Sequence, residues 1–491
     1  MLDGPRCDKS IVVIAGQVNS VCTARLRDDT WRVELPQMRR PNMEILLQQI
    51  ADHVCRLRYM SMSPELETLC RHRMVDVMGC ALAATEVAPV RMARALALRP
   101  GLRGPASLIG TTDSSSVEWA TLVNGLAIRY HDGADTFPGG GGHPSDCWAG
   151  LLALAQQQGS DLGTTFRAAV TAYEVFYALF KGGQLRDRGI DNVFYVSLAT
   201  AAGAGQLLGL KAEQIHHAMA MLISGNLALG VSRAGALSMW KSGASAHAAM
   251  NAVIVTLLAQ QGMQGPSLPL SGRRGLFELI GPFELAPLGD GSQGAMAMAR
   301  SDMKAFLCDY HSQTPILAAL QLYQALAQRS IERVDIQTYP FALSEAADDP
   351  AKWHPLNRET ADHSMPWIVA GVLLQGRFSE QLYEPSALND PRMHALTDRI
   401  TVRVAEDLRD RFPLCNPCRI NLRTTCGVEL SASEDLPLGH HLRPMTTEQV
   451  QEKFLALTAS RLQPARAQRL LDWIWTSPAA CKLDGLFALA G

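Results

Sequence analysis

One segment of this chain is apolar on every side of a helix, and it limits the possible folds more than any other feature. Residues 197–210, SLATAAGAGQLLGL, contain no charged side chain and are mostly alanine, glycine and leucine. A helix that is apolar all round is buried among other elements. Its small residues let neighbouring helices come close, so the segment predicts a large helical bundle.

Other segments of the first half carry apolar residues at three- and four-residue steps, the period of a helix. One start is clear at Ser63–Pro64, because serine caps a helix and proline suits its first turn. Aromatic residues make up only 6% of the chain, which favours close-packed helices over a β-sandwich. We expect further helices from about residue 43 and over 116–128, 146–158, 164–181, 194–209, 212–223 and 241–262.

The pattern changes after about residue 285, where the Gly-rich segment LGDGSQGAMAMARSD indicates a connection. Beyond it, strand-like segments rich in β-branched residues alternate with helical ones, and the pattern is helical again from Thr446. The expected strands lie in 331–343, 399–408 and 418–432, with a turn at Cys426–Gly427, and the expected helices are 313–328 and 363–375.

These patterns predict a mainly α protein with an α+β part. A helical domain would be formed by residues 43–285 and 435–491, because the chain leaves it for a second domain, 286–434, and then returns. Residues 1–42 are expected to be a poorly ordered N-terminal extension, since their apolar run Ile11–Ala15 is too short to cross a membrane and lacks the features of a signal peptide.

Charge and cysteine content restrict the class of protein. The net charge of −2, with 47% hydrophobic and 19% charged residues, is typical of a soluble globular protein and does not favour nucleic acid or an anionic membrane as a partner. The 11 cysteines are odd in number and scattered, which predicts free thiols in a reducing cytoplasm. Cys415 and Cys418 form a CxxC pair that Cys426 could extend, but no second pair is nearby, so no metal site is predicted.

The loop 129–146, RYHDGADTFPGGGGHPSD, is the strongest candidate for chemistry. Helix-like sequence flanks it, and loops held between rigid elements often carry function. Its carboxylates, its hydroxyl and its imidazoles can move protons when they lie close together. The alternative is a Gly-rich surface turn with ordinary polar residues. The side chains concerned are His131, Asp132, Asp135, Thr136, His143 and Asp146.

Three further polar groups precede or begin apolar helices. Lys241 stands at the start of a small-residue helix, where a cation is unfavourable for the helix dipole unless an anion is near. Helix N-termini bind anions, and the other two groups lie just before such ends. Helix capping and polar residues at the surface are the ordinary explanation of each group taken alone. These two groups contain Lys304, Tyr310, His311, Gln313 and Thr314, and Arg358, Glu359, Asp362, His363 and Ser364.

Four strings in order link these groups: GGHPSD at 141–146, WKSGASAHAA at 240–249, YHSQTPI at 310–316 and RETADHSMPW at 358–367. From about Met43 to the C-terminus the chain resembles the MmgE/PrpD family, which includes 2-methylcitrate dehydratase and cis-aconitate decarboxylase. The resemblance implies a large all-helical domain, a smaller α+β lid domain, a homodimer, and catalysis without metal or nucleotide cofactor.

The resemblance also implies roles for particular residues. The catalytic candidates are Asp132, Thr136, His143 and Lys241. Two departures are visible: the glycine run adds one residue before His143, and Asp191–Asn192 stand where many relatives have a histidine. The candidates for binding the substrate are Lys304, which would reach in from the lid, Tyr310, His311, Gln313, Arg358 and His363.

We therefore expect a cytoplasmic lyase that dehydrates 2-methylcitrate or a close analogue by acid/base catalysis. A base must lie beside the C–H bond, an acid near the leaving hydroxyl, and fixed cations near the carboxylates. The alternatives are a cis-aconitate-type decarboxylase, an isomerase or epimerase of a di- or tricarboxylate, and a binding protein without catalysis.

Overall fold

The computed structural model describes residues 10–14, 21–27, 30–34, 45–289 and 296–491. The chain divides into two compact units, Met1–Ile45 and Leu46–Gly491. The first contains an antiparallel sheet of order β1-β2-β3, which the sequence analysis did not predict. Its strands are β1 (Ser10–Ile14), β2 (Val21–Arg27) and β3 (Thr30–Glu34). The remainder of 1–42, including Ala15, lies outside the described residues, and its poor order stays a prediction.

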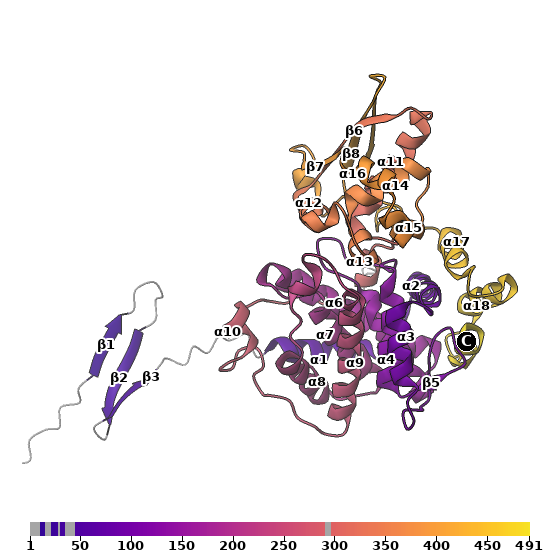
Figure 1. Ribbon diagram of the computed structural model, residues 1–491. Helices are drawn as coiled ribbons and strands as arrows, with labels where there is room; N and C mark the ends of the chain where they lie inside the picture. Colours follow the sequence, from indigo (N-terminus) through magenta and orange to yellow (C-terminus); the bar gives the residue numbers. More distant parts are fainter. Residues whose placement is uncertain (1–9, 15–20, 28–29, 35–44, 290–295) are drawn as a thin grey trace, which may run out of the picture. The chain divides into compact units, whose positions relative to one another are not determined.

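The second unit contains the predicted helical bundle (Figure 1). Each helix expected in the first half forms within a few residues of its predicted range; α3 and the short strand pair Ala106–Ser107 and Ser114–Ser115 were not predicted. The helices are α1 (Ile45–Leu57), α2 (Pro64–Ala83), α3 (Ala88–Ala97), α4 (Val117–Tyr130), α5 (Trp148–Gln158), α6 (Leu162–Gly183), α7 (Val193–Leu207), α8 (Ala212–Gly225), α9 (Trp240–Gln260) and α10 (Leu276–Ile280).

The centre of the bundle is α7, the helix that is apolar all round. Its residues from Val193 to Gln206 are all buried, and it packs against α5, α6, α8 and α9. Glycines in α7 permit this close packing: a Cβ at Gly203 would lie 2.7 Å from the carbonyl oxygen of Ala168 in α6. The bundle core thus follows from the small-residue pattern of the sequence.

The α+β part contains a four-stranded sheet of order β7-β6-β8-β9, in which only the β6–β7 pair is parallel. Helices α11 and α14 pack together, and their buried side chains join those of the sheet in one apolar core. The elements are α11 (Gln313–Leu326), β6 (Ile331–Thr338), α12 (Pro340–Ala346), α13 (Arg358–Ala361), α14 (Met365–Gln375), α15 (Pro385–Leu388), α16 (Pro391–Thr397), β7 (Ile400–Val404), β8 (Cys418–Thr424) and β9 (Glu429–Glu434).

Most of the expected strands form, and the turn at Cys426–Gly427 joins β8 to β9, where Gly427 has a φ of +85°. One difference concerns the predicted strand 331–343. It ends at Thr338, because Pro340 takes the first turn of a helix that continues to Ala346.

The chain then returns to the bundle through α17 (Thr447–Thr458), α18 (Pro464–Thr476) and α19 (Asp484–Ala490). Figure 1 shows α17 and α18 (yellow) beside α2, and both helices contact it. The fold is therefore mainly α with an α+β part, as predicted. The exact domain limits given above stay predictions.

Among the described residues, α9 alone is long and apolar enough to cross a membrane by length and composition, with a mean hydropathy of 1.3. Of that stretch, 61% is buried inside the protein, and α9 packs against α4, α7 and α8. Core helices of soluble proteins pass the same test, so α9 is described here as a core helix.

Candidate active site

Asp132 lies at the centre of a buried charge cluster just beyond the end of α4. Its φ of +51° places it in the left-handed region, which is uncommon for residues other than glycine and is found at functional sites. Its Oδ1 accepts hydrogen bonds from Arg129 Nη1 and, at 2.8 Å, from Lys304 Nζ. Burial alone would raise the pKa of Asp132, but the adjacent cations Arg129 and Lys304 hold it well below its usual range. The carboxylate is therefore ionised.

His143 faces this carboxylate from the other end of the loop. Its Nδ1 lies 2.9 Å from the carbonyl oxygen of Asp135, which can only accept, so Nδ1 carries a proton. Burial, with Arg129 and Lys304 nearby, lowers the pKa of His143 well below its usual range. The ring is therefore neutral, and Nε2, 3.5 Å from Asp132 Oδ1, keeps its lone pair. This arrangement suits a general base.

The loop that carries these groups is held in place by the side chain of Asp135, which is fully buried. Its carboxylate accepts from Arg73 Nε at 2.9 Å, Ser301 Oγ at 2.8 Å and the backbone N–H of Ser145 at 3.1 Å. The glycine run lets the loop pack tightly: Gly142 has a φ of +85°, and a Cβ there would meet the Asn192 side chain at 2.4 Å. The loop is thus a rigid support for His143.

Lys241, at the start of α9, is almost fully buried and belongs to an ion pair within the protein. Its Nζ donates to both carboxylate oxygens of Asp362, at 2.6 and 2.7 Å. His363 Nδ1 donates to the same carboxylate at 2.6 Å, and its Nε2 lies 3.3 Å from Asp132 Oδ2. The anion expected beside Lys241 is therefore Asp362, and the pair holds His363 against Asp132.

A small cavity of about 60 Å³ opens beside Asp132 and His143. It is lined by residues of the bundle and of the α+β part. Seven of the predicted site residues line it: Asp132, Thr136, His143, Lys304, Tyr310, His311 and His363. Arg186, Asn192, Arg233 and Glu345 line it too, and also line a neighbouring cleft of about 560 Å³. The cleft and the cavity therefore meet at these four residues.

Three predicted residues are not part of the cavity lining. Lys241 lies behind it in its pair with Asp362. Gln313 accepts from the backbone N–H groups of Ala305 and Phe306 and so fixes the turn after Lys304. The third, Arg358, donates to Glu380 and contacts the ring of His131. The roles given to these residues stay predictions, and the contacts favour support of the site over contact with substrate.

The sequence analysis did not select Arg129, Arg233 or Asn192. Arg129 lies inside the loop string already singled out, and its neighbour Asp132 was the available signal. Asn192 was noted only for the histidine that it replaces. For Arg233 no local signal exists, because its partners Asp191 and Lys241 become visible only in the folded chain.

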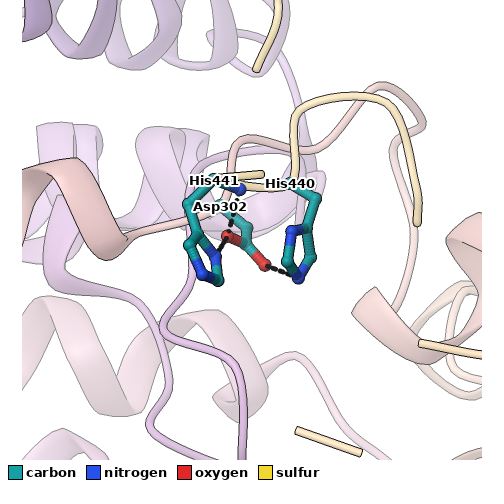
Figure 2. A group of neighbouring side chains, drawn as sticks. All are labelled: Asp302, His440 and His441. Carbon is teal, nitrogen blue, oxygen red and sulfur yellow. Dashed lines mark hydrogen bonds and ion pairs between the residues drawn. The ribbon is translucent and has the colours of Figure 1, made fainter. Parts of the chain in front are cut away.

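A second buried carboxylate, Asp302, lies directly behind the loop (Figure 2). Its backbone pairs with that of Thr136 through two hydrogen bonds of 2.9 and 2.7 Å. Its carboxylate accepts from Tyr310 Oη, and from the backbone N–H and ring Nδ1 of His441, both at 2.8 Å. Figure 2 shows the rings of His440 and His441 on either side of it. Asp302 thereby ties Tyr310 to the chain that returns towards α17.

In the described part of the chain, Asp302, His440 and His441 are the one group of His, Cys, Asp and Glu side chains close enough to share a metal ion. The hydrogen bonds do not fit this role. His440 Nδ1 accepts from the backbone N–H of Leu442 at 3.1 Å, so the ring proton is on Nε2, which faces Asp302. A nitrogen that carries a proton has no lone pair for a metal. The group is a hydrogen-bonded support.

The fold and site define a protein with a helical bundle, an α+β part and a buried, cation-rich cavity containing a neutral imidazole. The MmgE/PrpD N-terminal domain model matches residues 48–284 and the MmgE/PrpD C-terminal domain model matches residues 306–477. The chain therefore belongs to the MmgE/PrpD family.

Characterised relatives cover most of the chain at low identity. The chain is 28% identical to a 2-methylcitrate dehydratase of Cupriavidus necator, over 89% of this chain and 95% of that protein. It is 26% identical to a 2-methylcitrate dehydratase of Escherichia coli strain K12, over 88% and 94%. An alkylcitrate dehydratase, phiI, of Talaromyces stipitatus is 28% identical over 77% of this chain and 83% of that protein.

Proposed function

We propose that this protein is a hydro-lyase that removes water from 2-methylcitrate or a close alkylcitrate analogue. The names of the relatives support this class of reaction. One observation of the site carries the proposal: His143 is a buried, neutral imidazole whose Nδ1 proton is engaged and whose Nε2 lone pair lies beside a polar cavity.

In this reaction, His143 Nε2 takes the proton from the carbon next to a substrate carboxylate. The C–O bond of the neighbouring carbon breaks, the carbon–carbon double bond forms, and the leaving hydroxyl takes a proton and departs as water. Charge that develops on the carboxylate during proton removal is stabilised by the fixed cations around the cavity. Asp132, ionised and immobile, keeps Arg129 and Lys304 in place.

Tyr310 lines the cavity, but its hydroxyl proton is donated to Asp302, and burial together with that carboxylate raises the pKa of Tyr310 well above its usual range. Its proposed role is therefore to orient the substrate. His143, protonated by the first step, is the proposed source of the proton for the leaving hydroxyl, and giving it up returns the imidazole to its neutral form. Thr136 is held by Gly142 and Asp302 at the same wall, where its role is to orient the substrate.

Product analysis tests the proposal. Purified protein treated with a chelator is incubated with 2-methylcitrate, citrate and cis-aconitate, and the products are identified by NMR. An unsaturated tricarboxylate formed from a hydroxylated one, with no loss of carbon dioxide, is the expected result. Release of carbon dioxide would instead indicate a decarboxylase, and formation of a stereoisomer would indicate an epimerase. Binding without turnover would indicate a binding protein.

We also propose that the protein is a homodimer, as the resemblance implied. Exposed apolar side chains gather near the start of α9, where a second copy would cover them. They include Leu229, Val231, Met239 and Trp240, which are 60, 74, 46 and 54% exposed. Light scattering should give twice the mass of 53.3 kDa, and Trp240→Glu should shift the protein towards monomer. A monomeric parent protein would disprove this.

A further inference from the structure

The two lysines near the cavity are engaged within the protein. Lys304 Nζ contacts three oxygens, two of Asp132 and the carbonyl of Cys308, which uses all three of its protons. It cannot bind a substrate carboxylate without giving up an existing contact. Lys241 donates to both carboxylate oxygens of Asp362 and does not line the cavity.

Arg233 differs. Its Nε donates to Asp191 Oδ2 at 3.0 Å and its Nη1 donates to the carbonyl oxygen of Lys241 at 2.8 Å. These two contacts fix the guanidinium plane. Its Nη2 is buried and has no hydrogen-bond partner in the described structure. A buried donor without a partner is unfavourable and calls for an explanation, such as a ligand that completes it.

The position of Arg233 supplies that explanation. Arg233 lines both the cavity and the 560 Å³ cleft, so it lies where a ligand passes from one to the other. Asn192 shares both linings, and its Oδ1 is also buried without a partner. Two polar side chains at one junction therefore have unused hydrogen-bonding capacity.

The free donor at the junction suits an anionic group. Arg186 pairs with Glu345 of α12 and Arg233 pairs with Asp191, so the charges there are balanced, and Arg233 Nη2 is the donor that remains for a ligand. A guanidinium that is already held in one plane binds a carboxylate with little further loss of freedom. The unpaired Nη2 of Arg233 thus suits a carboxylate oxygen, and the amide of Asn192 suits a second polar atom of the same ligand.

We infer that Arg233 binds one carboxylate of the substrate, the one that lies farthest from the reacting carbon, and thereby selects tricarboxylates over dicarboxylates. This inference rests on the proposed function for the identity of the substrate. It adds a specificity-determining residue that acts through direct contact, with Asn192 beside it.

The test is equilibrium binding, which does not depend on turnover. Isothermal titration calorimetry is carried out with citrate and with citramalate, which has a methyl group in place of one carboxymethyl arm of citrate. The variant is Arg233→Lys, because lysine keeps the charge opposite Asp191 but cannot also supply the second donor arm. Arg300→Gln, at an exposed arginine, is the matched control.

Loss of one charge-assisted contact should weaken citrate binding by Arg233→Lys about 10- to 100-fold. Citramalate binding should change less than about threefold, and Arg300→Gln should bind both ligands as the parent does. Thermal unfolding and circular dichroism check that each variant is folded. If Arg233→Lys fails to fold, the same comparison is made with Asn192→Ala, for which a smaller loss confined to citrate is expected.

Equal weakening of both ligands, no weakening of either, or a parent protein that does not prefer citrate to citramalate would overturn the inference. Product analysis of the parent protein distinguishes a failure of the inference about Arg233 from a failure of the proposed function. Arg233-dependent citrate binding without dehydration would disprove the hydro-lyase assignment alone, and dehydration with unchanged binding by Arg233→Lys would disprove the role of Arg233 alone.

Discussion

Two buried aspartates belong to one region and are held in different ways: Asp132 is part of the loop 129–146, and Asp302 pairs with that loop at Thr136. Asp132 faces two cations, Arg129 and Lys304, and two histidine rings. Asp302 is held chiefly by neutral donors, the hydroxyl of Tyr310 and the backbone and ring of His441. Thr136 links them, because its backbone pairs with Asp302 and it follows Asp132 in the loop.

This difference indicates that Asp132 belongs to the reactive part of the site, whereas Asp302 supports the loop. Near Asp132, His143 Nδ1 donates to a backbone carbonyl oxygen and the ring lines the cavity, so the lone pair of Nε2 remains available to a ligand. Both carboxylate oxygens of Asp302 accept within the protein. His440 Nε2 has no hydrogen-bond partner, but the oxygens of the carboxylate are paired, and such pairing makes structure rigid. We therefore expect changes near Asp132 to affect turnover and stability strongly, and changes near Asp302 to have smaller effects.

The largest expected effect is on turnover at His143. His143→Asn keeps a polar side chain of similar size that cannot take up a proton, so the rate should fall about 10²- to 10⁴-fold. Thermal unfolding should show a folded protein, because asparagine can still donate to the carbonyl oxygen of Asp135. Steady-state kinetics provide the measurement. A folded variant with nearly the parent rate would remove His143 from the reaction and leave Asp132 as the candidate.

The next largest effect is expected on the free energy of unfolding, which can be compared directly for variants of the two aspartates. Asp132→Asn leaves Arg129 and Lys304 without their counter-charge and should cost about 3–5 kcal/mol of unfolding free energy. Asparagine tolerates the left-handed backbone at this position, so backbone strain does not contribute. Asp302→Asn removes a charge that faces neutral donors and should cost about 1–3 kcal/mol. Urea denaturation measures both, and equal losses would contradict the comparison.

The same contrast explains what the sequence could predict. Helices such as α7 and α9 were predicted because their apolar, small-residue composition is a local property of consecutive residues. The loop around Asp132 and His143 was predicted because unusual polar residues and glycines are close together in the chain. Both patterns can be recognised in the sequence without knowledge of tertiary contacts.

The partners in the ion pairs could not be predicted from the sequence in this way. Lys241 and Asp362 are 121 positions apart, so the position of Lys241 at a helix start indicates a nearby anion but not which residue supplies it. The free donor of Arg233 depends on Asp191 and on the backbone of Lys241, which only the folded chain brings together. The residues of a site can thus be predicted where they are local, whereas their roles depend on distant partners.

A third prediction concerns the protonation of His143. An ordinary imidazole with a pKa of about 6.5 changes from about 10% to about 90% protonated between pH 7.5 and 5.5. The pKa of His143 is lowered by burial and by Arg129 and Lys304, so its ring should stay neutral with the proton on Nδ1 over this range. Nitrogen NMR of histidine-labelled protein measures this, and His143→Asn identifies the signal. A titration of that signal between these pH values would contradict the assignment.

The smallest effect is expected at His441. Its ring donates to Asp302 Oδ1, but its backbone N–H donates to the same oxygen at 2.8 Å and remains after any substitution. The side chain is also one-quarter exposed, so water can replace the lost contact. His441→Ala should therefore cost about 0.5–1.5 kcal/mol of unfolding free energy, and His441→Gln, which can still donate, should cost less.

Turnover should fall by less than about fivefold in both variants, since that range corresponds to less than about 1 kcal/mol. Urea denaturation and steady-state kinetics, with Asp302→Asn as the reference, measure these changes. A loss of turnover at His441 as large as that at His143 would show that the Asp302 network takes part in proton transfer, and the division between reactive group and support would then be wrong.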